Sequence, residues 1–197
     1  MSDDDALAFT ESLIHLRQHV SPKRLVEPGP SAPQLNLIFE AAAAAPDHGL
    51  LVPWRFVLIP TELRDALGEM FAAALLERDA TASPEQVADA RAKARRGAVL
   101  LLCVADLAAR DPNTPAHERL VSLGCAIQNM MLTAQAMGFG AGLSSGQGMA
   151  SQALRHGFRL RDGEIAVCFV SFGTVTSAKP RRERPAPEQF VTTLVET

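Results

Sequence analysis

The sequence predicts an α+β fold, and two observations carry the prediction. Apolar runs of strand length alternate along the chain with capped, amphipathic segments of helix length. The 197 residues are 47% hydrophobic and 21% charged, which is typical of a globular chain and not of a disordered one. Strands are expected at residues 54–59, 99–104 and 165–172. Residues 99–104 are apolar without interruption, as a central strand covered on both faces is, and residues 165–172 are expected to be a second central strand.

Helices are expected before and between these strands, and several have a sequence signal at an end. Ser31 and Gln34 have the spacing of a capping box, and the same spacing recurs at Ser83 and Gln86, with a proline at the first turn. Gly138 ends the longest helix. The expected helices are residues 4–19, 31–46, 61–78, 83–96 and 114–137, and a short one that ends at Gly157.

The end of the chain differs from the rest in composition. Residues 174–197 are rich in Pro and Arg and show no helical period. We therefore expect one domain, residues 1–197, with a core at residues 1–173 and an extended C-terminal arm at residues 174–197. Such an arm is expected to pack on something, and a partner subunit is one candidate.

Charge and cysteine content exclude several classes of protein. Lys plus Arg number 19 and Asp plus Glu 22, a net charge of −3, which argues against nucleic-acid binding and against a polybasic membrane surface. The start is acidic and no apolar run approaches the roughly 20 residues that span a bilayer, so a cytoplasmic protein is expected. Cys103, Cys125 and Cys168 lack C-x-x-C spacing, so no zinc or other metal site is expected, and all three are expected to be small buried hydrophobes.

A glycine-rich stretch at residues 138–148 invites a nucleotide-binding interpretation that its spacing does not support. It follows a helix and fails the G-x-G-x-x-G pattern, and no Gly-Lys-Ser/Thr of a P-loop occurs. Ser144 and Ser145 lack the context of a hydrolase nucleophile. The glycines are compatible with a plain turn or with close approach of the backbone to a flat ligand.

Two basic features could be solvated charge or could bind an anion. Arg17 stands near the end of the first helix. Lys179, Arg181 and Arg182 lie close together in the arm. Two or three such cations could hold a single phosphate.

Three blocks of the sequence resemble the nitroreductase family of flavoproteins, in particular its short branch of NAD(P)H nitroreductases. Residues 17–25 are similar to the family's N-terminal phosphate element. Residues 45–56, with Ala-Pro-Asp-His followed by Pro-Trp, are similar to a signature of the branch. Residues 124–146 are similar to the family's long helix and glycine block. The blocks stand in the family's order and span most of the chain.

The resemblance implies a fold, a partner and an activity. The family's fold is a central mixed or antiparallel sheet flanked by helices in three layers, with an extended C-terminal arm. Its members are intertwined homodimers with FMN at the interface. They are oxidoreductases that pass hydride from NAD(P)H to the flavin and then to a nitroaromatic, quinone or similar acceptor in a ping-pong cycle. The flavin carries this chemistry, so no catalytic side chain is expected.

The resemblance also implies which residues contact FMN. One group would meet the phosphate or the ribityl oxygens, a second would line the flavin from the same or the opposite subunit, and a third would follow the isoalloxazine edge. The first group is Arg17, Gln18, His19, Lys179 and Arg181; the second is Ala44, His48 and Leu50; the third is Leu143, Ser144 and Ser145.

The chain departs from the family at several of these positions. Gln18 and His19 stand where Arg and Ser are common, Leu50 replaces a polar residue, and Ser144 stands where an Arg is frequent. These departures are compatible with weakened FMN binding and with a complete loss of FMN binding. The alternatives are therefore a flavin- or small-ligand-binding homologue without turnover, and a relative with other chemistry such as reductive dehalogenation or flavin fragmentation. Because its loop has become apolar, His48 is expected to be half-buried with FMN as its partner.

Overall fold

The protein is described by a computed structural model that covers residues 2–108, 111, 113–177, 180 and 183–194. Its centre is an antiparallel sheet with β1 and β2 at opposite ends of the path β1-β5-β3-β2, and with β4 also paired to β5. The strands are β1 (Leu25–Val26), β2 (Trp54–Leu58), β3 (Val99–Asp106), β4 (Gly140–Ser144) and β5 (Glu164–Val175).

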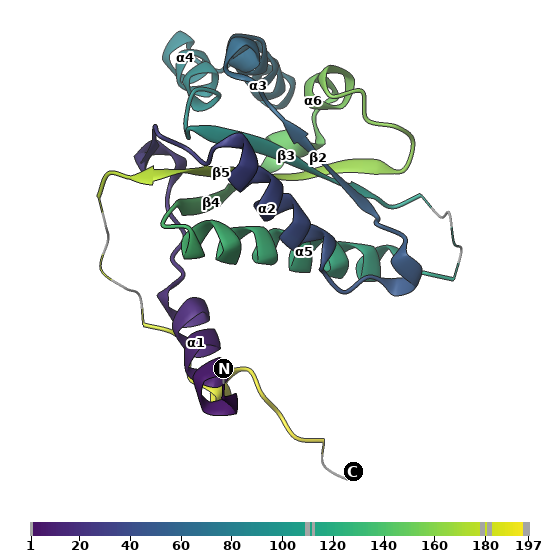
Figure 1. The fold of residues 1–197 in the computed structure, drawn as a ribbon. Helices are drawn as coiled ribbons and strands as arrows, with labels where there is room; N and C mark the ends of the chain where they lie inside the picture. Colours follow the sequence, from purple (N-terminus) through teal and green to yellow (C-terminus); the bar gives the residue numbers. More distant parts are fainter. Residues whose placement is uncertain (1, 109–110, 112, 178–179, 181–182, 195–197) are drawn as a thin grey trace.

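Helices cover both faces of this sheet, so the molecule has three layers (Figure 1). On one face lie α2 and α5, and on the other α3, α4 and α6. The helices are α1 (Asp3–Leu16), α2 (Ala32–Ala43), α3 (Arg64–Arg78), α4 (Pro84–Lys93), α5 (Ala116–Ala136) and α6 (Gln152–Gly157). The prediction of an α+β protein with a three-layered antiparallel arrangement is confirmed.

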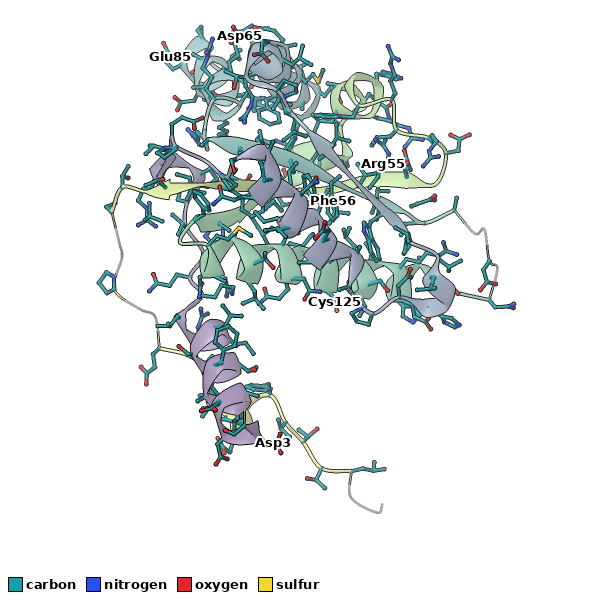
Figure 2. All side chains as sticks on the ribbon, viewed as in Figure 1. Asp3, Arg55, Phe56, Asp65, Glu85 and Cys125 are labelled. Atoms are coloured by element: carbon teal, nitrogen blue, oxygen red, sulfur yellow. The ribbon has the colours of Figure 1, made fainter. Side chains whose placement is uncertain are left out.

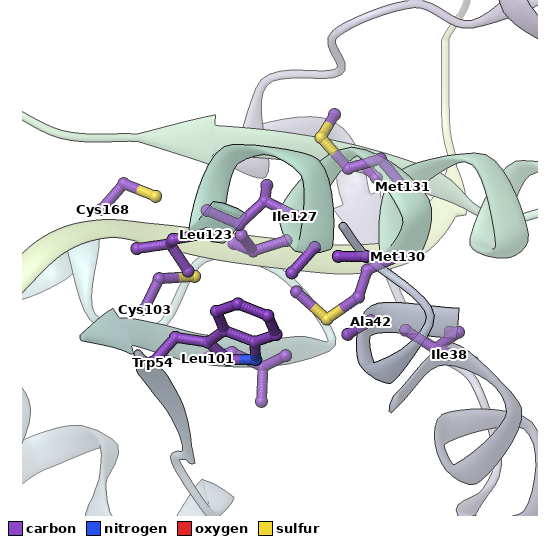
Figure 3. Packing of buried hydrophobic residues seen from close by; sticks show 14 of the residues in the cluster. Ile38, Ala42, Trp54, Leu101, Cys103, Leu123, Ile127, Met130, Met131 and Cys168 are labelled. Atoms are coloured by element: carbon purple, nitrogen blue, oxygen red, sulfur yellow. The ribbon is translucent and has the colours of Figure 1, made fainter. Parts of the chain in front are cut away.

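Strand β3 shows why its sequence is apolar without interruption. Leu101 and Cys103 face the cluster under α2 and α5, whereas Leu100, Leu102 and Val104 face the cluster under α3 and α6. Successive side chains of a strand point to opposite faces, so a strand between two helical layers needs apolar residues at every position. Figure 3 shows the first of these clusters, in which Trp54 packs beside Leu101.

Four predictions about the core and the strands need correction. Cys103 and Cys168 are buried as expected, but Cys125 is only half-buried and lies on the side of α5 away from the sheet (Figure 2). The glycine stretch was expected to be a turn or a ligand-contacting loop, yet part of it forms strand β4. Strand β5 begins one residue before the expected range and runs three residues beyond it, to Val175. Strand β1, of two residues, was not expected at all.

Helix α1 stands apart from the three layers. It begins with a capping box formed by Ser2 and Asp5, and it buries none of its residues. It ends at Leu16, three residues before the predicted end, and the chain then runs extended to Val20. Both α1 and the C-terminal residues project from the same side of the body (Figure 1).

A buried ion pair joins β5 to β2. The carboxylate of Glu164, 1% exposed, accepts hydrogen bonds from Arg55 at 2.8 and 2.9 Å and from Arg161 at 2.6 and 3.0 Å (Arg55 is labelled in Figure 2). The hydrogen bonds from Arg55 and then from Arg161 outweigh desolvation and lower the pKa of Glu164 from 4.5 to about 2. A carboxyl whose pKa is lower in the folded protein stabilises the fold above its unfolded pKa, and this contribution is lost as the pH falls toward the folded pKa.

We predict that Glu164→Gln lowers the free energy of unfolding by about 3 kcal/mol at pH 6, because two arginines lose their counter-charge. The difference between wild type and variant should shrink as the pH falls from about 5 toward 2. Urea unfolding across this pH range measures it. Glu69→Gln, which breaks the exposed pair with Arg91, is the control and should show a smaller, flatter difference. An equal difference at every pH would contradict the role given to Glu164.

Candidate functional site

A cavity of about 450 Å³ lies between the sheet and the helical layer of α3, α4 and α6. Its floor is formed by Leu100 of β3 and by Phe169 and Ser171 of β5. Its rim is the segment 143–149, which leaves β4 and runs toward α6. The volume falls within the range of small-molecule sites, roughly 300–1,000 Å³.

The rim of the cavity depends on one close backbone approach. The extended residues after α1 lie against β4, where Val20 N–H donates a hydrogen bond to the Ala141 carbonyl at 2.9 Å. His19 Nε2 donates to the Leu143 carbonyl at 2.7 Å. A Cβ on Gly142 would stand 1.9 Å from the Val20 carbonyl oxygen, so only glycine fits there. Close approach of backbone to backbone therefore explains this glycine.

One end of the cavity is cationic. Lys93, the last residue of α4, and Arg96, in the turn that follows, both line it. Neither is within ion-pair distance of an acidic group among the described residues. Two arginines of the same basic cluster are instead paired with acids of α3, of which Asp65 lies on the outer side of its helix (Figure 2). These pairs are Arg91–Glu69 and Arg95–Asp65.

The same end holds a buried hydroxyl without a partner. Ser171 is fully buried, lines the cavity, and its Oγ makes no hydrogen bond within the described part of the chain. Gly97 lies against it in a left-handed conformation (φ +81°), and a Cβ there would approach the Ser171 Cβ to 2.8 Å. A buried polar group left unpaired costs about 1–3 kcal/mol, which a hydrogen bond from a bound molecule that reached the hydroxyl would offset.

Apolar side chains form another part of the cavity, beside polar ones such as Arg78 and Gln147. Phe71 and Leu75 of α3, Leu154 of α6, Met149 of the rim and Phe169 of the floor surround it. A cavity lined by cations and hydroxyls as well as by aromatic and aliphatic side chains suits a planar ligand with both a polar and an apolar part.

The structure brings together part of the predicted site. His19 and all of Leu143, Ser144 and Ser145 line the cavity. The hydroxyl of Ser145 donates to the Val167 carbonyl at 2.9 Å, which holds the rim to β5.

Other predicted residues lie elsewhere. Arg17 and Gln18 line another cavity, of about 550 Å³, between α1, α5 and the start of β4. Ala44 and His48 lie at the end of α2 and just beyond it, and with Leu50 they line neither cavity. Lys179, Arg181 and Arg182 fall outside the described residues.

The loop around His48 differs from the prediction. The His48 side chain is 61% exposed, so the expectation of a half-buried imidazole is wrong for the single chain. Its Nδ1 lies 3.0 Å from Glu118 Oε2, and this hydrogen bond, followed by the charge of Glu118, raises the pKa of His48. Leu50 and Val52, 85% and 56% exposed, adopt positive φ angles of 53° and 45°. Such angles are strained for branched side chains, and strained, exposed apolar loops occur at binding surfaces.

Three residues of the cavity, Lys93, Arg96 and Ser171, were not predicted from the sequence. Lys93 and Arg96 belong to a basic cluster that also suits the C-terminus of a helix. Ser171 had a usable signal, because it is the one hydroxyl in the apolar run 165–172. Within the described ranges, the structure contains no group of three metal-binding side chains and no helix that is long and apolar enough to cross a membrane.

Comparison with known proteins gives consistent matches over most of the chain. Residues 16–174 match the model of the nitroreductase family. A Haemophilus influenzae protein named "Putative NAD(P)H nitroreductase" is 34% identical over 185 residues, which cover 93% of this chain and 100% of that protein. Escherichia coli YdjA, with the same description, is also 34% identical, over 92% of this chain and 97% of its own length.

Solved structures show the same fold. A nitroreductase-like protein from Bacillus cereus superposes with a TM-score of 0.78 at 18% identity, covering 93% of this chain and 94% of that one. The NADPH:FMN oxidoreductase of Vibrio harveyi, solved with NAD+, gives a TM-score of 0.72 at 16% identity, over 93% of this chain and 76% of its own.

Proposed function

This chain belongs to the nitroreductase family, and from that premise we propose that it is an FMN-dependent oxidoreductase that passes hydride from NAD(P)H to a nitroaromatic, quinone or similar small acceptor. The observation that carries the proposal is the cavity, whose buried unpaired hydroxyl and unpaired cations suit a ligand with an electron-rich polar edge.

The residues of the cavity fit FMN. Its isoalloxazine has a ring rich in carbonyl oxygens and nitrogens at one end and a dimethylbenzene ring at the other. Lys93, Arg96 and the Ser171 hydroxyl would hold the polar end, and Phe71 and Leu75 the apolar end. Bound there, FMN would supply two-electron chemistry in alternating half-reactions with NAD(P)H and with the acceptor.

The chain's own residues would bind and orient the cofactor and would exclude water from it. The imidazole of His19 already donates a hydrogen bond to the Leu143 carbonyl. His19 would therefore stabilise the rim. Backbone groups of residues 143–145 would border the ring. Arg17 stays our proposed ligand of the FMN phosphate, approached from the neighbouring cavity.

We further propose a homodimer in which the loop of His48 and Leu50 reaches the cavity of the partner subunit. These residues line neither cavity of their own chain, and their loop exposes apolar side chains in a strained conformation. Other exposed apolar side chains support an interface. They include Leu7, Phe9, Ile14 and Leu16 of α1, Leu37 of α2, Val121 of α5, and Phe190, Val191 and Leu194 of the arm.

The activity is tested on the protein as purified. We expect a yellow protein with the spectrum of bound oxidised flavin, which NADPH or NADH bleaches under argon. Lys93→Met/Arg96→Met should raise the dissociation constant of FMN at least about tenfold, equivalent to about 1.4 kcal/mol, because two charges at the polar edge are lost. The matched control is Arg91→Met/Arg95→Met, which removes two paired arginines of the same cluster and should leave FMN binding within about twofold.

Two results would count against the activity. Protein that binds no FMN when it is added in excess would contradict flavin-dependent chemistry. Flavin that stays oxidised with both reductants would favour a ligand-binding homologue without turnover.

Assembly is tested by light scattering. We expect the full chain to be a dimer and Phe9→Asp to weaken it, because a charge would replace an apolar side chain that is 59% exposed in the single chain. Glu11→Gln, also on α1, is the control for Phe9→Asp and should stay dimeric.

Removal of residues 175–197 should yield insoluble or flavin-free protein. A well-behaved monomer for the full chain would contradict the proposal.

A further inference from the structure

Arg64, at the start of α3, is buried, and its guanidinium donates hydrogen bonds to backbone carbonyls and not to a carboxylate. Arg64 is only 5% exposed, and no carboxylate of the described residues lies within ion-pair distance of its guanidinium. Nε donates to the Ile59 carbonyl at 3.2 Å, and Nη1 donates to the carbonyls of Ala94 at 2.9 Å and Arg96 at 3.4 Å. Nη2 donates to the Ala98 carbonyl at 3.5 Å. Burial lowers the pKa of Arg64, because desolvation disfavours the charged guanidinium.

Three of these four carbonyls belong to one turn, residues 94–98, which joins α4 to β3. The same turn carries Arg96 into the cavity and places Gly97 against Ser171. Lys93 immediately precedes it. The last carbonyls of a helix lack intrahelical partners, and a planar guanidinium can bind several of them at once.

We propose that Arg64 is a positioning residue for the cofactor site: it fixes the turn 94–98 so that Lys93 and Arg96 face the cavity. Arg64 does not line the cavity itself, so it acts through these two side chains. The proposal rests on the proposed function, because the ligand used to test it is FMN.

The chain contains a matched control for this role. Arg119 of α5 is 2% exposed and donates from Nε, Nη1 and Nη2 to the carbonyls of Thr114, Ala108 and Asp111 at 2.9–3.1 Å. It therefore binds other backbone carbonyls in the same way, and it lines neither cavity. Loss of either guanidinium leaves buried carbonyls unpaired and destabilises the fold. Of the two, only Arg64 is expected to act on FMN binding through Lys93 and Arg96.

The experiment compares Arg64→Met, Arg119→Met, Lys93→Met/Arg96→Met and the triple variant of Arg64, Lys93 and Arg96. FMN dissociation constants come from fluorescence titration, and unfolding temperatures and the visible spectrum of bound flavin are recorded alongside. We expect both single variants to lower the unfolding temperature, but only Arg64→Met to weaken FMN by about tenfold and to shift the flavin spectrum. In the Lys93→Met/Arg96→Met background, Arg64→Met should have no further effect on FMN binding, since residues that act as one unit are not additive.

Two further measurements separate positioning from other roles. Arg64→Lys keeps the charge but lacks the fork that reaches several carbonyls, so it should bind FMN as weakly as Arg64→Met. It also serves if the methionine variant does not fold. Trypsin cleaves after Lys93, Arg95 and Arg96, so cleavage in this turn should be faster in Arg64→Met than in wild type and Arg119→Met.

The proposal is overturned if Arg64→Met and Arg119→Met weaken FMN equally, if the effects of Arg64 and of the Lys93/Arg96 pair add, or if Arg64→Lys restores binding fully. The trypsin comparison needs no flavin. If the wild type binds no FMN, the proposed function fails, and unchanged cleavage of the turn in Arg64→Met separately overturns the positioning role.

Discussion

Ser171 lies in the sheet, and among the described residues its hydroxyl has no hydrogen-bond partner. The cavity that it lines is also lined by Lys93 and Arg96, which form no ion pair in that part of the chain. A folded protein keeps such a hydroxyl at a cost of about 1–3 kcal/mol, and the cost is recovered when a ligand supplies the missing partner. The surrounding structure maintains this arrangement. Gly97 leaves room beside Ser171, and Arg64 holds the turn that carries Arg96. The rim is closed on the other side by the backbone contact across Gly142. This arrangement supports the proposed site for a ligand with a polar edge.

The parts of the fold that could be predicted are those that local chemistry determines. The capping box at Ser31 and Gln34 starts α2 where expected, and the apolar run of β3 is buried on both faces. Strand β4 was missed because glycine has low strand propensity, and its pairing with β5 is a long-range contact. Strand β1 has only two residues, too few for a periodic signal.

The site was predictable in part for the same reason. Residues 143–145 and His19, which the family resemblance assigns to FMN, line the same cavity. The resemblance did not separate Arg17 and Gln18 from His19, because only the folded path of the chain assigns neighbouring residues to different cavities. Lys93 and Ser171 are far apart in the sequence, and packing of α4 and its turn on the sheet brings them to one cavity. His48 is exposed in the described chain, and the homodimer proposed above would place it, with the exposed apolar side chains of α1 and the arm, at an interface.

The measurement that tests this account most directly is the thermal unfolding of Ser171→Ala with and without FMN. The substitution removes the unpaired hydroxyl and little else. The FMN-free variant should unfold about 2–4 °C above the FMN-free wild type, because about 1 kcal/mol of unsatisfied polarity is gone. Saturating FMN should then raise its unfolding temperature by less than it raises that of the wild type, since one ligand contact is missing. A variant that is less stable without FMN and gains as much as the wild type from FMN would contradict the account.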